Sequence, residues 1–340
     1  MKEVRFGLIG LGAMGMAHAK TLLGDVPNAQ LCAAATASQT HAAELLALPG
    51  AEDVRVFATP AEMYQSGLID AVLIATPHRL HVRQAVEAFR AGEIDALVTA
   101  PVCKQCIHSD EFAMGHTEYL QKQFGGEGDR ALMILFNDLM RVAVATTHLP
   151  IKDVPAAITK DLVLNKIEDF GKALTQDFGI DGPKIAVLSL NPHAGDGGLL
   201  GTEEQEQIAP AIKEAEAKGI LAFGPFAADG LFGSGAWRRF DGILAMYHDQ
   251  GLAPFKLMAG DDAVNFTAGL PVVRTSPDFG TAFDIAGAGK ADASGMRTAI
   301  YAAVDLLRTR KRHLKAAANP LRKHYVERGT DKSVDLSKED

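Results

Sequence analysis

The chain has 340 residues, of which 47% are hydrophobic and 22% are charged, with a formal net charge of −8. These values predict a globular protein of two domains or one large one, and the negative charge argues against nucleic acids and anionic membranes as partners. No apolar run is long enough to cross a bilayer and the N-terminus lacks a signal-peptide pattern, so we expect a cytoplasmic protein.

Strand-like and helix-like segments alternate over the first hundred residues. Helix-like segments fill the gaps between strand-like segments at 4–10, 29–37, 54–59, 69–77 and 94–101. Alternation of this kind predicts a parallel, doubly wound α/β sheet in the N-terminal part of the chain.

The stretch "GLIGLGAMG" joins the first predicted strand to the first predicted helix. Gly10, Gly12 and Gly15 have the spacing of a dinucleotide-binding turn, which makes them candidates for cofactor binding. The acidic residue expected about 20 positions later is absent, because Ala35 and Thr36 occupy that part of the second strand. Two interpretations stay open, which are a nucleotide site and a turn retained for packing.

Residues 1–92 resemble the N-terminal domain of the glucose–fructose oxidoreductase and inositol dehydrogenase family. The similarity rests on "GLIGLGAMG", "IDAVLIATPHRLH" and "AVEAFRAG". That family implies a catalytic Lys in a Glu-Lys-Pro motif and an Asp-x-x-x-His pair, and this chain has neither. The resemblance therefore implies a Rossmann-like fold unit without that family's chemistry.

The rest of the chain continues in mixed α/β style. Strand-like segments recur at 129–137, 140–150, 183–195, 240–251 and 263–287, and amphipathic helices are predicted at 158–179, 202–219 and 293–317. The segment 202–219 begins with Thr202 followed by acidic residues, which suit the positive end of a helix.

Three histidines stand directly after apolar strand-like segments. They are His148 in "VAVATTHLP", His193 in "LSLNPHAGDGG" and His248 in "ILAMYHDQG". Ligands bind at strand ends in α/β sheets, and three neutral imidazoles suit a divalent metal with open positions for substrate. Their separations match no local metal motif, so polar loop residues remain the alternative interpretation.

Further polar residues in similar positions could bind an anionic substrate. They are His116, Thr117, Lys256, Asn265 and Arg274. Lys256 and Arg274 could hold a phosphate or carboxylate, Arg274 through a bidentate fork. The alternative for each is an ordinary surface charge. Asp196 and Asp249 are candidate partners of the neighbouring histidines.

Residues from about 84 to 322 resemble the 4-hydroxythreonine-4-phosphate dehydrogenase family. The motifs that carry the similarity are, in order, "GEIDALVTAPVCK", "GHTEYL", "VAVATTHLP", "LNPHAGDGG", "MYHDQGL", "VNFTAGLPVVRTS" and "GTAFDIAGAGKA". The resemblance implies NAD as cofactor and a homodimer whose subunits share the active site. The implied ligands of a divalent metal, which is zinc, magnesium or cobalt, are His148, His193 and His248.

The same resemblance assigns the other site residues. The implied substrate-binding residues are His116, Thr117, Lys256, Asn265 and Arg274, of which Lys256 and His116 are the catalytic candidates. Asn191 and Asp229 join Gly10, Gly12 and Gly15 as cofactor-binding candidates.

The implied fold is an α/β body like that of the isocitrate and isopropylmalate dehydrogenases, preceded by the doubly wound N-terminal unit. The two resemblances together describe a chimera joined between about Ala85 and Glu93. We expect a unit at 1–110 packed by a helix at 291–325, a metal- and substrate-binding domain at 111–290, and a polar tail at 326–340.

The implied activity is oxidation of a phosphorylated hydroxy acid, with 4-hydroxythreonine 4-phosphate as the first candidate. Hydride passes to NAD⁺, and the β-keto product then loses its carboxylate, a step of pyridoxal phosphate synthesis. Two alternatives stay open. One is a sugar or polyol oxidoreductase of the N-terminal family, and the other is an inactive or nucleotide-binding fusion protein.

Overall fold

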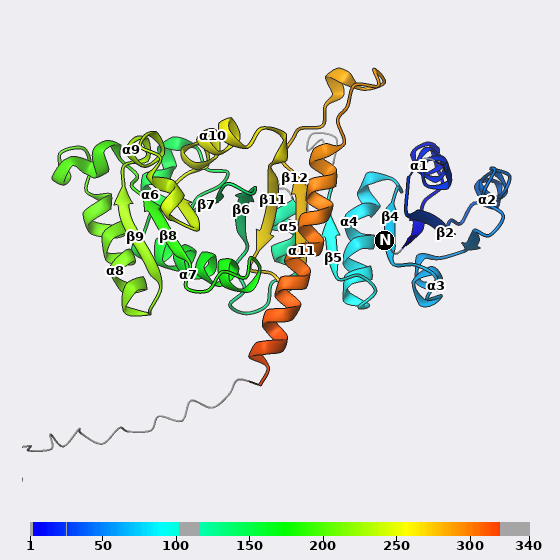
Figure 1. Ribbon diagram of the computed structural model, residues 1–340, viewed down its shortest axis with the longest axis horizontal. Helices are drawn as coiled ribbons and strands as arrows, with labels where there is room; N and C mark the ends of the chain where they lie inside the picture. Colours follow the sequence, from blue (N-terminus) through cyan, green and yellow to red (C-terminus); the bar gives the residue numbers. More distant parts are fainter. Residues whose placement is uncertain (1–2, 25, 102–115, 320–340) are drawn as a thin grey trace, which may run out of the picture.

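The computed structural model of the chain describes residues 3–24, 26–101 and 116–319. Its strands form two sheets in an elongated molecule (Figure 1). The N-terminal unit lies at one end, and β9 (Leu221–Phe226) with α8 (Ala209–Ala217) lies at the other. The predicted polar tail at 326–340 falls outside the described residues.

The first sheet has four parallel strands in the order β3-β2-β1-β4. Leu8 packs with Ala19 and Leu45 on one face, whereas Ile9 packs with Met63 on the other. Because consecutive strand residues point to opposite faces, helices cover both sides and the doubly wound parallel unit is confirmed. The elements are β1 (Val4–Ile9), α1 (Ala13–Gly24), β2 (Ala29–Ala35), α2 (Gln39–Leu46), β3 (Arg55–Phe57), α3 (Pro60–Gln65), β4 (Ala71–Ile74) and α4 (His78–Arg90).

The second sheet has eight strands in the order β5-β12-β11-β6-β7-β10-β8-β9. β6 pairs antiparallel with β7 and β11, β11 pairs antiparallel with β12, and the other neighbours are parallel. The chain is therefore mixed α/β with parallel strands in both sheets. The strands not yet bounded are β5 (Ala96–Val98), β6 (Leu132–Phe136), β7 (Arg141–Val144), β8 (Lys184–Leu188), β10 (Gly242–Ala245), β11 (Val264–Ala268) and β12 (Val273–Pro277).

The position of β5 corrects a prediction. We expected residues 94–101 to extend the N-terminal parallel sheet, but β5 pairs with β12 of the second sheet. The physical reason is hydrophobic packing, since Leu97 joins a buried cluster with Leu120, Leu270 and Val272. The boundary between the two sheets thus falls in α4 and the turn after it.

The helix α11 (Ser294–Ala317) covers β12, β5 and β11 at one end of the second sheet (Figure 1). We expected a helix at 291–325 to pack on the unit at 1–110; α11 does contact β5, which lies in that range, but it also covers β12 and β11 of the second sheet. Arg310 holds α11 in place, because its Nε donates to Asp177 Oδ1 at 2.6 Å with both side chains buried. Its Nη1 donates to the carbonyls of Leu270 and Pro271.

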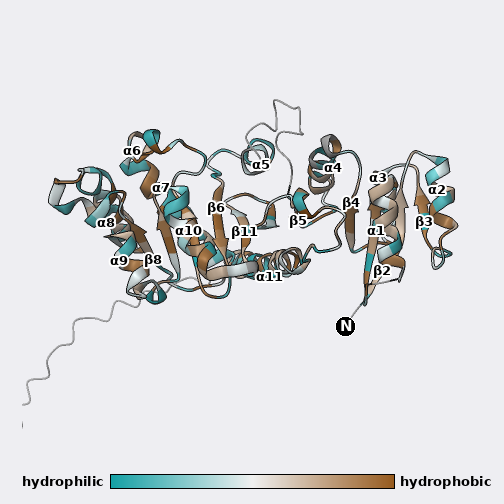
Figure 2. Cartoon of the chain, turned by 90° about the horizontal axis from the view of Figure 1, so that it is seen from above, coloured by the Kyte–Doolittle hydropathy of each residue, from teal (hydrophilic) through white to brown (hydrophobic). Residues whose placement is uncertain are grey.

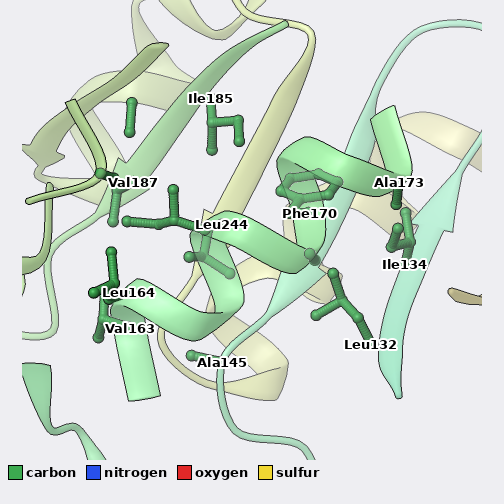
Figure 3. Close-up of a cluster of buried hydrophobic side chains, with 14 of the residues drawn as sticks. Leu132, Ile134, Ala145, Val163, Leu164, Phe170, Ala173, Ile185, Val187 and Leu244 are labelled. Atoms are coloured by element: carbon green, nitrogen blue, oxygen red, sulfur yellow. The ribbon is translucent and has the colours of Figure 1, made fainter. Parts of the chain in front are cut away.

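The helix α7 (Lys160–Gln176) builds the largest core (Figure 3). Thr159 caps it by accepting from the backbone N–H of Leu162 at 3.2 Å. Its buried side chains recur every three to four residues. Phe170 and its neighbours pack against Ile134 of β6 and Leu244 of β10, which fixes the middle of the sheet.

The remaining helices are α5 (His116–Phe124), α6 (Val154–Ala157), α9 (Ala228–Gly233) and α10 (His248–Ala259). The strands are the most hydrophobic segments, as Figure 2 shows for β3 and β4. Within the described parts of the chain, no helix is both long and apolar enough to cross a membrane.

Candidate active site

The three predicted histidines follow three neighbouring strands of the second sheet. His148 comes after β7, His248 opens α10 after β10, and His193 comes after β8. These strands are parallel and adjacent in the order β7-β10-β8. Their carboxyl ends therefore meet at one edge of the sheet, with His248 between the other two in strand order.

His148 and His248 lie in one pocket. Their ring centroids are 6.3 Å apart, and both line a cavity of about 240 Å³ together with Tyr247 and Ile151. His248 Nδ1 lies 2.7 Å from Asp249 Oδ1, so a ligand would bind His248 through Nε2. The expected contact of Asp249 with the neighbouring histidine is present, and its role as partner of a metal ligand stays a prediction.

His193 is exposed on a separate loop, which we call the His193 loop (Pro192–Gly198). Within the described residues, no three His, Cys, Asp or Glu side chains gather closely enough to hold a metal. One chain by itself therefore brings together two of the three predicted ligands. Asp196, the predicted partner of His193, is exposed on the same loop.

The His193 loop has an unusual backbone. From His193 to Gly197 every residue has a positive φ, with 53° at His193, 53° at Ala194 and 45° at Asp196. Left-handed conformations cost non-glycine residues roughly 1–2 kcal/mol each. Such strain persists only where the surroundings hold the backbone in place, and it is concentrated at functional sites.

A chain of hydrogen bonds joins the three strand ends. Thr146 Oγ1 donates to the Met246 carbonyl at 2.8 Å, and the Met246 N–H donates to Gln250 Oε1 at 2.8 Å. Gln250 Nε2 donates to the Ser189 carbonyl at 2.6 Å, and Ser189 Oγ donates to the Asn191 carbonyl at 2.9 Å. These bonds set the spacing of the strands that carry the histidines.

Sequence reasoning missed Thr146 and Gln250. The signal was present in part, because Gln250 stands two residues after His248 and Thr146 two residues before His148. An amide near a strand end can pair both with its own turn and with a neighbouring strand. Which neighbour it meets depends on strand order, which the sequence did not show.

The predicted substrate residues Arg274 and Asn265 lie on the β11–β12 ladder. Arg274 is 4% exposed, and its guanidinium donates to Thr99 Oγ1 at 2.6 and 3.0 Å and to Thr267 Oγ1 at 3.3 Å. Thr267 pairs with Arg274, and Asn265 is two residues away on the same face. Asn265 Oδ1 is buried without a hydrogen-bond partner among the described residues. An unsatisfied buried acceptor fits a polar ligand site.

Lys256 is half exposed on α10, with Nζ 3.0 Å from Asp278 Oδ2. It lies eight residues after His248, which is about 12 Å along a helix. The pocket with His148 and His248 contains neither Lys256 nor Arg274. The lining of this pocket therefore joins two of the metal candidates without Lys256 or Arg274.

The structure places His116 and Thr117 at the start of α5. Thr117 is half buried, and Leu120 of the same helix packs with Val272 beside the start of β12. The α5 helix therefore begins near the strand that carries Arg274. The substrate roles of His116 and Thr117 stay predictions.

The cofactor candidates fall in three places. Gly10 and Gly15 form a tight turn, since a Cβ at Gly15 would overlap the Gly10 carbonyl, whereas a Cβ at Gly12 would meet no atom within 4 Å. Asn191 Nδ2 donates to Glu203 and Glu204 at 2.8 and 3.0 Å. Asp229 is exposed in the first turn of α9. The structure does not bring these five residues into one pocket, and their cofactor roles stay predictions.

The donor chemistry fits a divalent metal. Neutral imidazoles at a strand-end edge are suitable ligands for zinc or cobalt, and Asp249 already orients one of them. His148 and His248 line one cavity, and His193 is exposed after the neighbouring strand β8.

Mixed α/β architecture with histidines at the carboxyl ends of adjacent parallel strands defines an α/β enzyme of the type that binds small ligands at strand ends. Residues 18–303 match the family described as Pyridoxal phosphate biosynthetic protein PdxA, and the chain belongs to it.

The relatives agree with this assignment. The chain is 57% identical over 251 residues to a 4-hydroxythreonine-4-phosphate dehydrogenase of Bacteroides thetaiotaomicron, covering 74% of this chain and 69% of the relative. It is 40% identical over 303 residues to the enzyme of that name from Bradyrhizobium diazoefficiens, covering 87% and 86%. The crystal structure of the Klebsiella pneumoniae 4-hydroxythreonine-4-phosphate dehydrogenase matches with TM-score 0.65 and 29% identity, covering 90% and 98%.

Proposed function

We propose that the protein is a metal-dependent NAD dehydrogenase that oxidises a phosphorylated hydroxy acid, with 4-hydroxythreonine 4-phosphate as its substrate. The main support for this proposal is that His148, His248 and His193 follow the carboxyl ends of three adjacent parallel strands. Relatives named for this activity, identical at up to 57% of aligned positions, support the proposal. The reaction belongs to pyridoxal phosphate synthesis.

In this proposal, different residues bind the substrate and the metal ion. Arg274 and Lys256 bind the anionic ends of the substrate, Arg274 from a buried position that limits its motion. Asn265 binds a polar group through its buried oxygen, and Thr117 and His116 bind the phosphate from the start of α5. His148, His193 and His248 hold a divalent ion that, when bound, lowers the pKa of the substrate hydroxyl. Bound NAD⁺ would accept the hydride from the carbon that carries the hydroxyl, and the β-keto product would then lose carbon dioxide.

We propose further that the active site is shared by two subunits of a homodimer. Support comes from the separation of the histidines from Arg274 and Lys256 within one chain. The segments around the histidines also carry exposed apolar side chains, which a second copy could cover. These side chains are Leu149, Ile151, Leu199, Leu200 and Leu257.

The N-terminal unit is proposed to be a separate folding unit, divided from a two-domain body of the isocitrate dehydrogenase type. Its separate four-stranded sheet supports this division. Descent of residues 1–92 from the inositol dehydrogenase family gains no support from the comparisons, because the family match begins at residue 18. We place NAD beside Asn191 and Asp229 rather than at Gly12, since the turn at Gly10 to Gly15 lacks its acidic partner.

The test is NADH formation from 4-hydroxythreonine 4-phosphate with zinc or cobalt present. Activity is expected in the unmodified protein, and His193→Ala is expected to lose both activity and bound metal. Full activity in His193→Ala with unchanged metal content would refute the metal assignment. Tight NAD binding without turnover would favour the alternative of a nucleotide-binding protein, and metal-independent turnover of inositol would favour a polyol oxidoreductase.

A further inference from the structure

Glu204 is a buried carboxylate that the proposed reaction does not use. Its side chain is 3% exposed, and it forms no ion pair among the described residues. Instead it accepts three hydrogen bonds. The backbone N–H groups of Leu190 and Asn191 donate to Oε1 at 2.8 and 2.7 Å, and Asn191 Nδ2 donates to Oε2 at 3.0 Å. A buried carboxylate is costly without such partners. All three donors belong to the short segment of Leu190 and Asn191.

That segment is the start of the His193 loop. Leu190 and Asn191 are separated only by Pro192 from the run of positive φ at His193–Gly198, so the carboxylate fixes the backbone just before the left-handed turn begins. Gly195 lies against the same carboxylate from the other side. A Cβ there would come within 2.7 Å of Glu204 Oε2, which leaves room for glycine alone.

The helix that carries Glu204 is adapted to this contact. Residues Glu204–Ile208 form a π-helical turn that runs into α8. Such turns are rare and are frequent at functional sites. Ile208, at its end, is buried in the core with Ala211, so the turn is anchored on the α7 side of the sheet. The carboxylate therefore connects a rigid core helix to a strained loop.

We infer that Glu204 is a positioning residue for His193: it holds the left-handed His193 loop in the one conformation that presents the imidazole at the edge of the sheet. The inference deepens the proposed function, because it takes His193 as a metal ligand. The loop geometry that Glu204 controls is measurable without any metal. Loss of a residue that orients a metal ligand typically weakens metal affinity about 10–100-fold.

The decisive variant is Glu204→Gln, with Glu206→Gln as its matched control. Glu206 lies in the same π-helical turn, is exposed, and gives the same change of charge. In metal-free full-length protein, amide hydrogen exchange of residues 190–199 is expected to be at least about tenfold faster in Glu204→Gln, whereas other core peptides keep their protection. Titration with Co²⁺ is expected to show affinity reduced about 10–100-fold, with no change in Glu206→Gln.

Gly195→Ala provides a second route to the same contact. It keeps the carboxylate and crowds it, so it is expected to accelerate exchange in residues 190–199 and weaken Co²⁺ binding in the same direction. If Glu204→Gln does not fold, this variant decides the question. Exchange and Co²⁺ affinity equal to those of Glu206→Gln in both variants would overturn the inference.

His193→Ala separates the inference from the proposed function. It is expected to abolish tight Co²⁺ binding while leaving exchange in residues 190–199 close to that of the unmodified protein. Unchanged Co²⁺ affinity in His193→Ala would refute the metal assignment. The exchange data on Glu204→Gln would still decide whether Glu204 holds the loop.

Discussion

The buried ion pair between Arg310 and Asp177 gives the sharpest stability prediction. Asp177 is 2% exposed and Arg310 is 6% exposed, and the pair connects α11 to the end of α7. Asp177→Asn keeps the shape of the side chain but leaves the guanidinium charge buried without its counter-ion. Removing one partner of a buried pair costs about 3–5 kcal/mol, and we expect the lower end because Asn can still accept one hydrogen bond.

The assay uses urea unfolding followed by the fluorescence of Trp237. This is the one tryptophan of the sequence, and it is buried beside the second sheet, so its signal reports the body that α11 covers. With a urea dependence of about 3 kcal/mol per molar, a loss of about 3 kcal/mol lowers the midpoint by about 1 M.

The control is Asp305→Asn on the same helix. Asp305 and Arg308 are 3.9 Å apart and more than three-quarters exposed, so this pair is expected to contribute nothing measurable. A midpoint shift in Asp177→Asn no larger than that of Asp305→Asn would refute the reasoning. A double change of Asp177 to Leu and Arg310 to Met is expected to recover most of the loss, because it leaves no buried charge.

Three further predictions follow from single contacts. Gln250→Leu, which removes the bonds of Gln250 to the Met246 N–H and to the Ser189 carbonyl, is expected to lower kcat at least about tenfold and to lower the Trp237 unfolding midpoint as well, because two buried backbone groups lose a partner; loss confined to KM would contradict this. Gly12→Ala should leave the thermal midpoint unchanged, whereas Gly15→Ala should lower it, because only the second Cβ overlaps backbone; equal midpoints would contradict the turn geometry. Burial raises the pKa of Tyr64 to about 12, so the folded state favours the protonated phenol and stability should fall as pH rises from about 10 toward that value. Tyr64→Phe should flatten that fall in alkaline urea titrations, and an unchanged slope would count against the burial effect.

The sequence predicted the elements better than the sheets. Periodicity and glycine turns placed the N-terminal strands and helices correctly, because their core is made locally by residues such as Leu8 and Leu45. The prediction from sequence was wrong for β5, which pairs with β12 of the second sheet. That pairing depends on contacts of Leu97 with Leu120 and Leu270, which are distant in the chain. No pattern within residues 94–101 carries that information.

The candidate site shows the same limit. The sequence shows a histidine after each of three predicted strands. It does not show that β7, β10 and β8 are neighbours, because their order in the sheet differs from their order in the chain. A residue that positions another site residue, as Glu204 is proposed to position His193, has no recognisable motif in the sequence. Glu204 reads as one acid among several in a helix, and only its burial and its bonds to Leu190 and Asn191 distinguish it.

The geometry of α10 connects these observations to the proposed dimer. The helix begins at the strand-end edge with His248 and carries Lys256 about two turns away, where Lys256 meets Asp278 after β12. About 12 Å of helix separates the backbones of His248 and Lys256, so one small substrate contacts both residues of a single chain only where the two side chains extend toward it. In the proposed dimer, the His248 and the Lys256 that act on one substrate molecule would come from different copies of the chain. The distance between His248 and Lys256 within one subunit follows from their positions along α10. The exposed Leu257 on the same helix lies where a second copy could cover it.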